Sequence, residues 1–242
     1  MDSEARQKIQ VVLVIAIAVA AIRTGYILYE RRAESQAEVQ KQAPPLNPDY
    51  YVTPKKLYSY DLKSAQQLTQ QPVWVKVGYS IAYYPYDAAR KKSDFKHQKG
   101  TLGPLEKLDI KNVVLDTSPD APGERQIMAV FKENGSTYSF PIGSVRDGDY
   151  HFLSNDMLFI QDPHELYKHW PADIWSAIDQ HQVKPGMSQL QADFAIGLGQ
   201  PENSGGYGEG TMWYSNGGKP LEVTYNHDKA VEIHEGQARK GS

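Results

Sequence analysis

The segment VKPGMSQLQADFAIGLGQP, residues 183–201, predicts a short helix whose two ends are both marked in the sequence. Ser188 and Gln191 have the spacing of a capping box, in which each side chain bonds the backbone N–H of the other residue. Gly199 and Pro201 predict the end of the helix. The apolar residues recur every four positions and predict one apolar face: Leu190, Phe194 and Leu198. A helix of about ten residues is marginal alone, so we expect it to pack on its neighbours.

The sequence around this segment predicts an α-α-β-β-β order. Residues 164–182 have a helical pattern in two pieces, because Pro171 suits the first turn of a second helix. Runs rich in β-branched and aromatic residues then predict three strands: 211–215, 221–225 and 230–234. We expect the short helix to pack between the preceding helix and this three-stranded meander.

Both the order and the residues resemble the SmpA/OmlA (BamE-like) fold family over about residues 183–233. The matching residues are Gly186-Met187-Ser188, Gln191-Ala192, Leu198-Gly199-Gln200-Pro201 and Trp213-Tyr214. The resemblance implies a BamE-like domain that scaffolds assembly complexes of a bacterial-type cell envelope. The same fold is similar to that of secreted β-lactamase inhibitory proteins. The chain departs from the family in having no cysteine for lipid attachment and in carrying a β-rich region before the matching part.

Residues 51–152 have the pattern of a small β domain. Asn134-Gly135 separates two apolar runs, and both residues accept the positive φ of a type I′ turn, so the pair predicts a β-hairpin. The runs at 73–81 and 105–115 predict further strands. Short strands with long loops predict a small barrel that resembles an SH3-like barrel in outline, and this outline implies no function.

The first residues predict a membrane anchor. Residues 9–29 are mostly apolar, and this length suffices for a helix to cross a bilayer. Arg23 lies near the end of the span, where its long side chain reaches the interface. We expect an uncleaved transmembrane helix with the folded part on the extracytoplasmic (periplasmic) side. Basic residues on both sides of the span leave its orientation open.

A cleaved signal peptide is the alternative for the same segment. Ala18-Val19-Ala20 has the small residues of a cleavage site, and cleavage after Ala20 releases a secreted protein. The apolar run continues through Ile22, which favours the anchor.

The sequence therefore predicts an α+β protein with an N-terminal transmembrane helix and two folded domains. A polar helical stalk ends at Pro44-Pro45, where an extended linker begins. The predicted segments are a tail (1–8), the anchor (9–29), the stalk and linker (30–50), the SH3-like β domain (51–152), the BamE-like domain (153–236) and a second tail (237–242).

Composition and spacing argue against several kinds of site. A net charge of −3 disfavours a nucleic-acid partner, which requires a basic face. With 0 cysteines the chain has no disulfide, thiol nucleophile or cysteine-ligated metal. The glycines of 205–210 lead into a strand and not into a helix N-terminus, so they do not predict a phosphate loop. The sequence predicts no catalytic residue, metal or small-molecule cofactor.

Surfaces remain as candidate sites, and tyrosine marks them. The chain has 16 tyrosines against 6 phenylalanines. Tyrosine combines an apolar ring with a polar tip and is enriched at protein interfaces. We expect Trp74 and Trp213 to lie in the core. Six tyrosines are the predicted partner contacts: Tyr79, Tyr83, Tyr84, Tyr86, Tyr207 and Tyr214.

Together these features predict a single-pass membrane-anchored, non-enzymatic protein that binds or assembles other envelope or membrane proteins. The lipid bilayer is a further predicted partner, through residues 9–29. Two alternatives stay open: a hydrolase-type enzyme with a site between the two domains, and a secreted inhibitor-like module. A cleft lined by clustered ionisable groups with shifted pKa values favours the enzyme.

Overall fold

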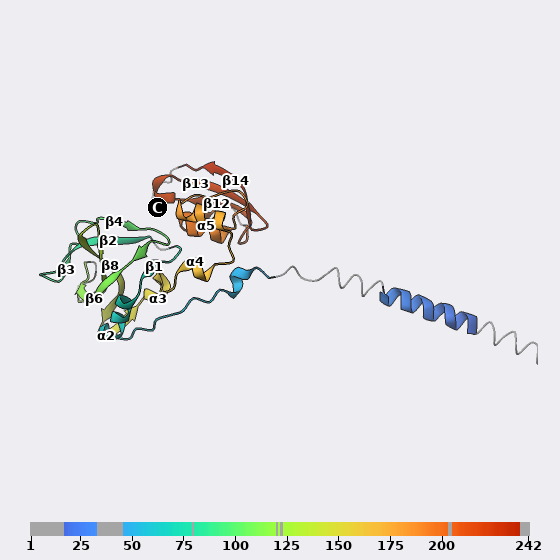
Figure 1. Ribbon diagram of the computed structural model, residues 1–242, viewed down its shortest axis with the longest axis horizontal. Coiled ribbons are helices and arrows are strands. Elements are labelled where there is room, and N and C mark those ends of the chain that lie inside the picture. Colours follow the sequence, from blue (N-terminus) through green and yellow to red (C-terminus); the bar gives the residue numbers. More distant parts are fainter. Residues whose placement is uncertain are drawn as a thin grey trace, which may run out of the picture. The chain divides into compact units, whose positions relative to one another are not determined.

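The structure is a computed structural model that describes residues 17–32, 46–78, 80–119, 121, 123–202 and 205–237. The chain divides into two units, residues 1–50 and residues 51–242. In the first unit, residues 17–32 are helical. The 3-10 helix η1 (Pro48–Tyr51) leads from the first unit into the second. All strands of the described residues belong to the second unit (Figure 1).

The transmembrane helix predicted over residues 9–29 is wrong. Among the described residues, no helix combines the length and the apolar character that crossing a membrane requires. The described helical stretch, 17–32, carries Arg23, and a charged side chain is costly in the interior of a bilayer. The predicted single-pass membrane localisation depended on this helix and is corrected with it. Residues 1–16 and 33–45, which include part of the predicted span and most of the stalk, lie outside the described residues.

Seven strands of the second unit form one sheet. The path runs β3-β2-β8-β7-β6, with β4 paired to β2 and β9 paired to β8. The strands are β2 (Ile81–Asp87), β3 (Lys92–Ser93), β4 (Gly100–Leu102), β6 (Ile110–Thr117), β7 (Arg125–Glu133), β8 (Ser136–Arg146) and β9 (Asp149–Phe152). β3 and β6 stand at the two ends of this path, and the SH3-like outline stays a prediction.

The predicted strand at 73–81 is divided between two sheets. Gly78 has a φ of 93° and turns the chain in the middle of this run. The part before the turn is β1 (Val73–Val75), which pairs with β10 (Leu158–Phe159) and β5 (Lys107–Leu108) in a three-stranded sheet. The part after the turn begins β2 of the large sheet.

The β-hairpin predicted at Asn134-Gly135 is confirmed. The two residues join β7 to β8 and have φ values of 47° and 80°, as a type I′ turn requires. The hairpin also supplies large side chains of the first hydrophobic core, all of them fully buried: Ile127, Phe131, Phe140 and Ile142. The turn therefore aligns the two strands that carry the centre of this core.

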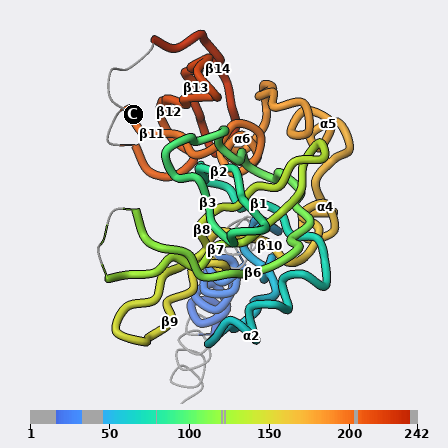
Figure 2. The backbone as a smooth tube through the Cα atoms, turned by 90° about the vertical axis from the view of Figure 1, so that its left-hand side faces the viewer, coloured from blue at the N-terminus to red at the C-terminus, as the bar shows by residue number. Residues whose placement is uncertain are grey.

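The C-terminal layer consists of three short helices and a four-stranded sheet. The helices are α4 (Pro163–Leu166), α5 (Ala172–Asp179) and α6 (Gln189–Ile196). The antiparallel sheet has the order β11-β12-β13-β14, with bounds Gln200–Pro201, Gly210–Tyr214, Leu221–Asn226 and Lys229–Glu235. The three predicted strands are thus confirmed as β12 to β14. Within the second unit, this layer lies at the end opposite β9 and α2 (Leu62–Ala65) (Figure 2).

The capping box of α6 is confirmed, but its C-terminal end differs from the prediction. Ser188 Oγ accepts from the Gln191 N–H at 3.2 Å, and Gln191 Oε1 accepts from the Ser188 N–H at 2.9 Å. Gly197, with a φ of 90°, stops the helix, and Leu198 is left 58% exposed. Seven of the eight helical residues are buried, so the predicted one-sided apolar face is corrected.

Aromatic rings around α6 form a second core that adjoins the first. The Phe194 ring centroid lies 6.1 Å from that of Phe159, which belongs to β10. The partner strand of β10 is β1, whose Val73 and Val75 lie in the first core. β10 lies beyond the predicted boundary at residue 152 yet pairs with a strand before it. Residues 51–242 accordingly form one compact unit with two cores.

A capping box also starts α2, and it provides a first test of the structure. Asp61 Oδ1 accepts from the Ser64 N–H at 2.7 Å, and Ser64 Oγ accepts from the Asp61 N–H at 3.1 Å. We expect Asp61→Ala to lower the free energy of unfolding by about 1 kcal/mol, because an N–H of the first turn loses its acceptor. Urea denaturation measures this change. Asp61→Asn keeps a capping oxygen and should retain most of the stability; equal losses for both variants would argue against the cap.

Candidate functional site

Three predicted contact tyrosines lie on β2 and are half-buried. The Tyr83 ring packs edge-on against Tyr138 with a centroid distance of 5.2 Å. Tyr84 packs in the same manner on Phe95, also at 5.2 Å. Burial raises the pKa of the Tyr86 hydroxyl. These rings therefore pack within the large sheet and leave only part of their surface for a partner.

The other three predicted tyrosines have different positions. Tyr79 lies outside the described residues. Tyr207 is 60% exposed in the loop between β11 and β12. Tyr214 is fully buried, with its hydroxyl oxygen 2.8 Å from that of Tyr225. The expectation that Tyr214 belongs to a binding face is therefore corrected, because its ring lies in the second core.

A more exposed tyrosine surface lies in residues 51–61, which we call the strap. The strap runs in extended form to α2 (cyan in Figure 1) and belongs to no strand. Gln161 Oε1 accepts from the Lys55 N–H at 2.7 Å, and Asn155 Oδ1 accepts from the Leu57 N–H at 2.8 Å. Side chains from distant parts of the sequence therefore hold the strap backbone in place.

Inward and outward residues alternate along the strap. Val52 packs against the second core and Leu57 against the first. Three tyrosines point to solvent, with exposed fractions of 68%, 76% and 76%: Tyr51, Tyr58 and Tyr60. These residues were not among the predicted contacts. The sequence pattern that could have indicated them is the alternation in Leu57-Tyr58-Ser59-Tyr60, where every second residue is a tyrosine. Such alternation is typical of an extended chain with one buried side.

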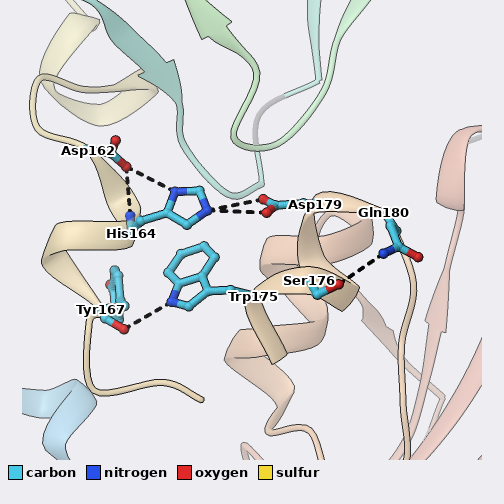
Figure 3. A network of polar contacts seen from close by, with 7 residues as sticks. All are labelled: Asp162, His164, Tyr167, Trp175, Ser176, Asp179 and Gln180. Carbon is cyan, nitrogen blue, oxygen red and sulfur yellow. Dashed lines mark hydrogen bonds and ion pairs between the residues drawn. The ribbon is translucent and has the colours of Figure 1, made fainter. Parts of the chain in front are cut away.

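A polar network joins α4 to α5 (Figure 3). His164 Nδ1 lies 3.1 Å from Asp162 Oδ1, and His164 Nε2 lies 3.2 Å from Asp179 Oδ1. The imidazole stacks on Trp175 with a centroid distance of 4.0 Å, and Trp175 Nε1 donates to the Tyr167 carbonyl at 3.3 Å. Because both imidazole nitrogens have a carboxylate partner, the network fastens two short helices and presents no free nitrogen to a substrate.

One carboxyl group is buried beneath the C-terminal sheet. Asp193 of α6 is 3% exposed, and its side chain is hydrogen-bonded to Tyr214. The Gly199 N–H donates to Asp193 Oδ1 at 3.4 Å. Burial raises the pKa of Asp193 to about 7, and the two hydrogen bonds only partly oppose this shift. The protonation of Asp193 therefore changes in the neutral range, inside the protein.

A cleft of about 770 Å³ lies between the loops of the β-rich part and the C-terminal layer. Among its described lining residues, the ionisable side chains are His181 and Lys219. Asp193 is not one of these residues, so the strongly shifted carboxyl group does not face the cleft. The described residues also contain no group of three His, Cys, Asp or Glu side chains placed to hold a metal ion.

Comparison with known proteins returns no match to a family model, to a curated protein or to a solved structure. The resemblance of residues 183–233 to the SmpA/OmlA family therefore stays a prediction. The function must be argued from the strap, the cleft and the buried groups themselves.

Proposed function

We propose that this chain is a non-enzymatic protein that binds a protein partner through the strap. The observation that carries the proposal is the pair Tyr58 and Tyr60, each 76% exposed on a backbone that hydrogen bonds hold in place. Alternate residues of an extended chain project to the same side, so the two rings offer one contact surface. Tyrosine is enriched among the residues that dominate interface energies. A fixed backbone loses little entropy on binding.

The charges of the strap indicate the chemistry of the partner. Lys55 and Lys56 are exposed beside the tyrosines. A partner surface that combines apolar area with acidic side chains fits this combination, because opposite charges speed association and fix orientation. The apolar area receives the rings, and the acidic side chains face the two lysines.

The resemblance to the SmpA/OmlA family forms part of the same proposal. Its support is the order of elements, in which the capped helix α6 is followed by the antiparallel meander β12–β13–β14. Scaffolding of protein assemblies, which the resemblance implies, is a non-catalytic role. It agrees with a strap that exposes Tyr51, Tyr58 and Tyr60 to solvent.

Site-specific photo-crosslinking in cells tests the proposed function. With p-benzoylphenylalanine in place of Tyr58, we expect a light-dependent crosslink to one discrete protein. Tyr29, which is 73% exposed in the other unit, is the matched control position and should not give this product. The double variant Tyr58→Ser, Tyr60→Ser should lower capture of the partner at least about tenfold, since one interface tyrosine contributes about 1–2 kcal/mol or more. Undiminished capture by this variant would count against the strap.

The hydrogen bonds under the strap give a second prediction. Asn155→Ala removes the acceptor of the half-buried Leu57 N–H and should lower the free energy of unfolding by about 1 kcal/mol. The same variant should weaken partner capture although both tyrosines are retained. Asn155→Asp keeps the acceptor oxygen and is the control. Chemical denaturation measures the first effect. If Asn155→Ala captures the partner as efficiently as the wild type does, the strap need not be fixed for binding.

A further inference from the structure

The cleft has the volume of a ligand site and an apolar floor. Its volume of about 770 Å³ falls in the range of about 300–1,000 Å³ found for pockets that bind small molecules. The apolar lining comes from both sides of the cleft: Leu102, Pro104, Ala195, Ile196 and Leu198. At one end the two sides are in contact, because the Leu198 side chain packs closely against Gly78. A Cβ added at Gly78 would lie only 2.5 Å from Leu198 Cδ1. This contact explains why Leu198, which is 58% exposed, is held at the cleft and not in the core.

His181 lies in the cleft in a left-handed backbone conformation. It follows α5 with a φ of 53°, in the left-handed region where glycine or asparagine is common after a helix. The imidazole Nδ1 lies 2.9 Å from the Ala195 carbonyl oxygen and therefore donates its proton to that oxygen. This bond fixes the ring and leaves Nε2 for another contact, in which it donates to a carboxylate when the imidazole is protonated on both nitrogens.

Charge is distributed unevenly around His181. The ionisable side chains among the described lining residues of the cleft are those of His181 and Lys219. Two carboxyl groups, those of Glu106 and Asp179, line an adjoining cavity of about 340 Å³ that His181 also lines. Glu106 Oε2 is occupied there by the Gly103 N–H at 3.0 Å. The cleft thus combines an apolar floor with cationic and hydroxyl groups, including those of Ser80 and Thr101.

We propose that this cleft binds a carboxylate that carries an apolar chain. The carboxylate lies at Lys219 and His181, and the chain lies against the floor formed by Ile196 and Leu198. A free branched-chain acid and the C-terminal carboxylate of a peptide ending in leucine share this chemistry. The cleft is separate from the strap, so the proposal does not depend on the partner proposed above.

Binding to the full chain is measured by NMR and calorimetry with four probes. They are 4-methylpentanoate, 4-methylpentanamide, N-acetyl-alanyl-leucine and the amide of this peptide. We expect both acids to shift the resonances of Ser80, Thr101 and His181, and both amides to bind at least about tenfold more weakly. Tighter binding of the peptide acid assigns the site to a peptide C-terminus. Equal or tighter binding of 4-methylpentanoate assigns it to a free acid.

Two variants separate a binding role from a structural one. Lys219→Gln lies on an exposed turn, and His181→Asn places a residue that accepts a left-handed φ at this position. Each should lower the affinity for both acids at least about fivefold, with little change in melting temperature. Lys229→Gln, at an exposed residue of β14 outside the cleft, is the control and should change neither the affinity nor the melting temperature. Equal affinity for acid and amide, unchanged affinity in both variants, or no binding of either acid below about 10 mM would overturn the proposal.

Discussion

Phe194→Ala is expected to lower the free energy of unfolding of the second unit by about 3–5 kcal/mol. Phe194 is 2% exposed and lies at the centre of the second core. Its ring centroid lies 4.9 Å from that of Tyr167, 5.1 Å from that of Trp170 and 6.5 Å from that of Trp175. The variant loses these contacts and leaves a cavity that the rigid rings cannot fill. Because typical domains are stable by only about 5–15 kcal/mol, a loss of this size can unfold much of the protein.

Leu198→Ala is the matched control for this prediction. The sequence pattern places Leu198 on the same helical face as Phe194, yet the structure leaves it 58% exposed beyond the end of α6. We expect a loss below about 1 kcal/mol for the control, since little apolar surface returns to water. Urea denaturation followed by tryptophan fluorescence reports on both variants. Similar losses for the two would mean that the helix continues through Leu198.

Asp193 is expected to make the folded state less stable as the pH rises from about 4 to about 8. Burial raises the pKa of Asp193 to about 7, from an ordinary value of 3.8. The folded protein therefore holds a proton that the unfolded chain has already lost over this interval. The stabilising contribution is complete below the unfolded pKa and is lost as the pH rises through the folded pKa. The loss is on the order of 4 kcal/mol for a shift of this size.

Asp193→Asn should remove most of this pH dependence. The amide keeps an oxygen for the Gly199 N–H and cannot ionise, so the variant should exceed the wild type in stability at about pH 8. Equilibrium denaturation between about pH 4 and about pH 8 measures the slope. Asp173→Asn, at an exposed carboxyl of α5, is the control and should leave the slope unchanged. A wild-type profile without a decline toward pH 8 would show that the pKa of Asp193 is not raised in the folded protein.

The local features of the sequence predicted local structure well. Ser188 with Gln191 fixed the start of α6, and Asn134-Gly135 fixed the turn between β7 and β8. Both signals act through backbone groups within a few residues. The end of α6 was placed too late because Gly197 and Gly199 are both able to end a helix, and the spacing of apolar residues favoured the second.

Features that depend on distant residues were not predictable in this way. The run at 73–81 reads as one strand, but β1 finds its partners in β10 and β5, far along the chain. Tyr214 and Tyr58 have the same side chain, and only the tertiary fold decides that the first is buried and the second is 76% exposed. The buried position of Asp193 was hidden for the same reason, since polar residues in a short helix normally face water.

The strap is synthesised long before the groups that anchor it. Gln161 follows Lys55 by 106 residues, and Asn155 follows Leu57 by 98 residues. At about 5–20 residues per second, the ribosome needs about 5–20 s to make this interval of chain. During that time the strap tyrosines sit on an unanchored chain, and afterwards on a fixed one. A partner that meets the nascent chain therefore encounters a different ligand from one that meets the finished protein, and the two routes of assembly should differ in association rate.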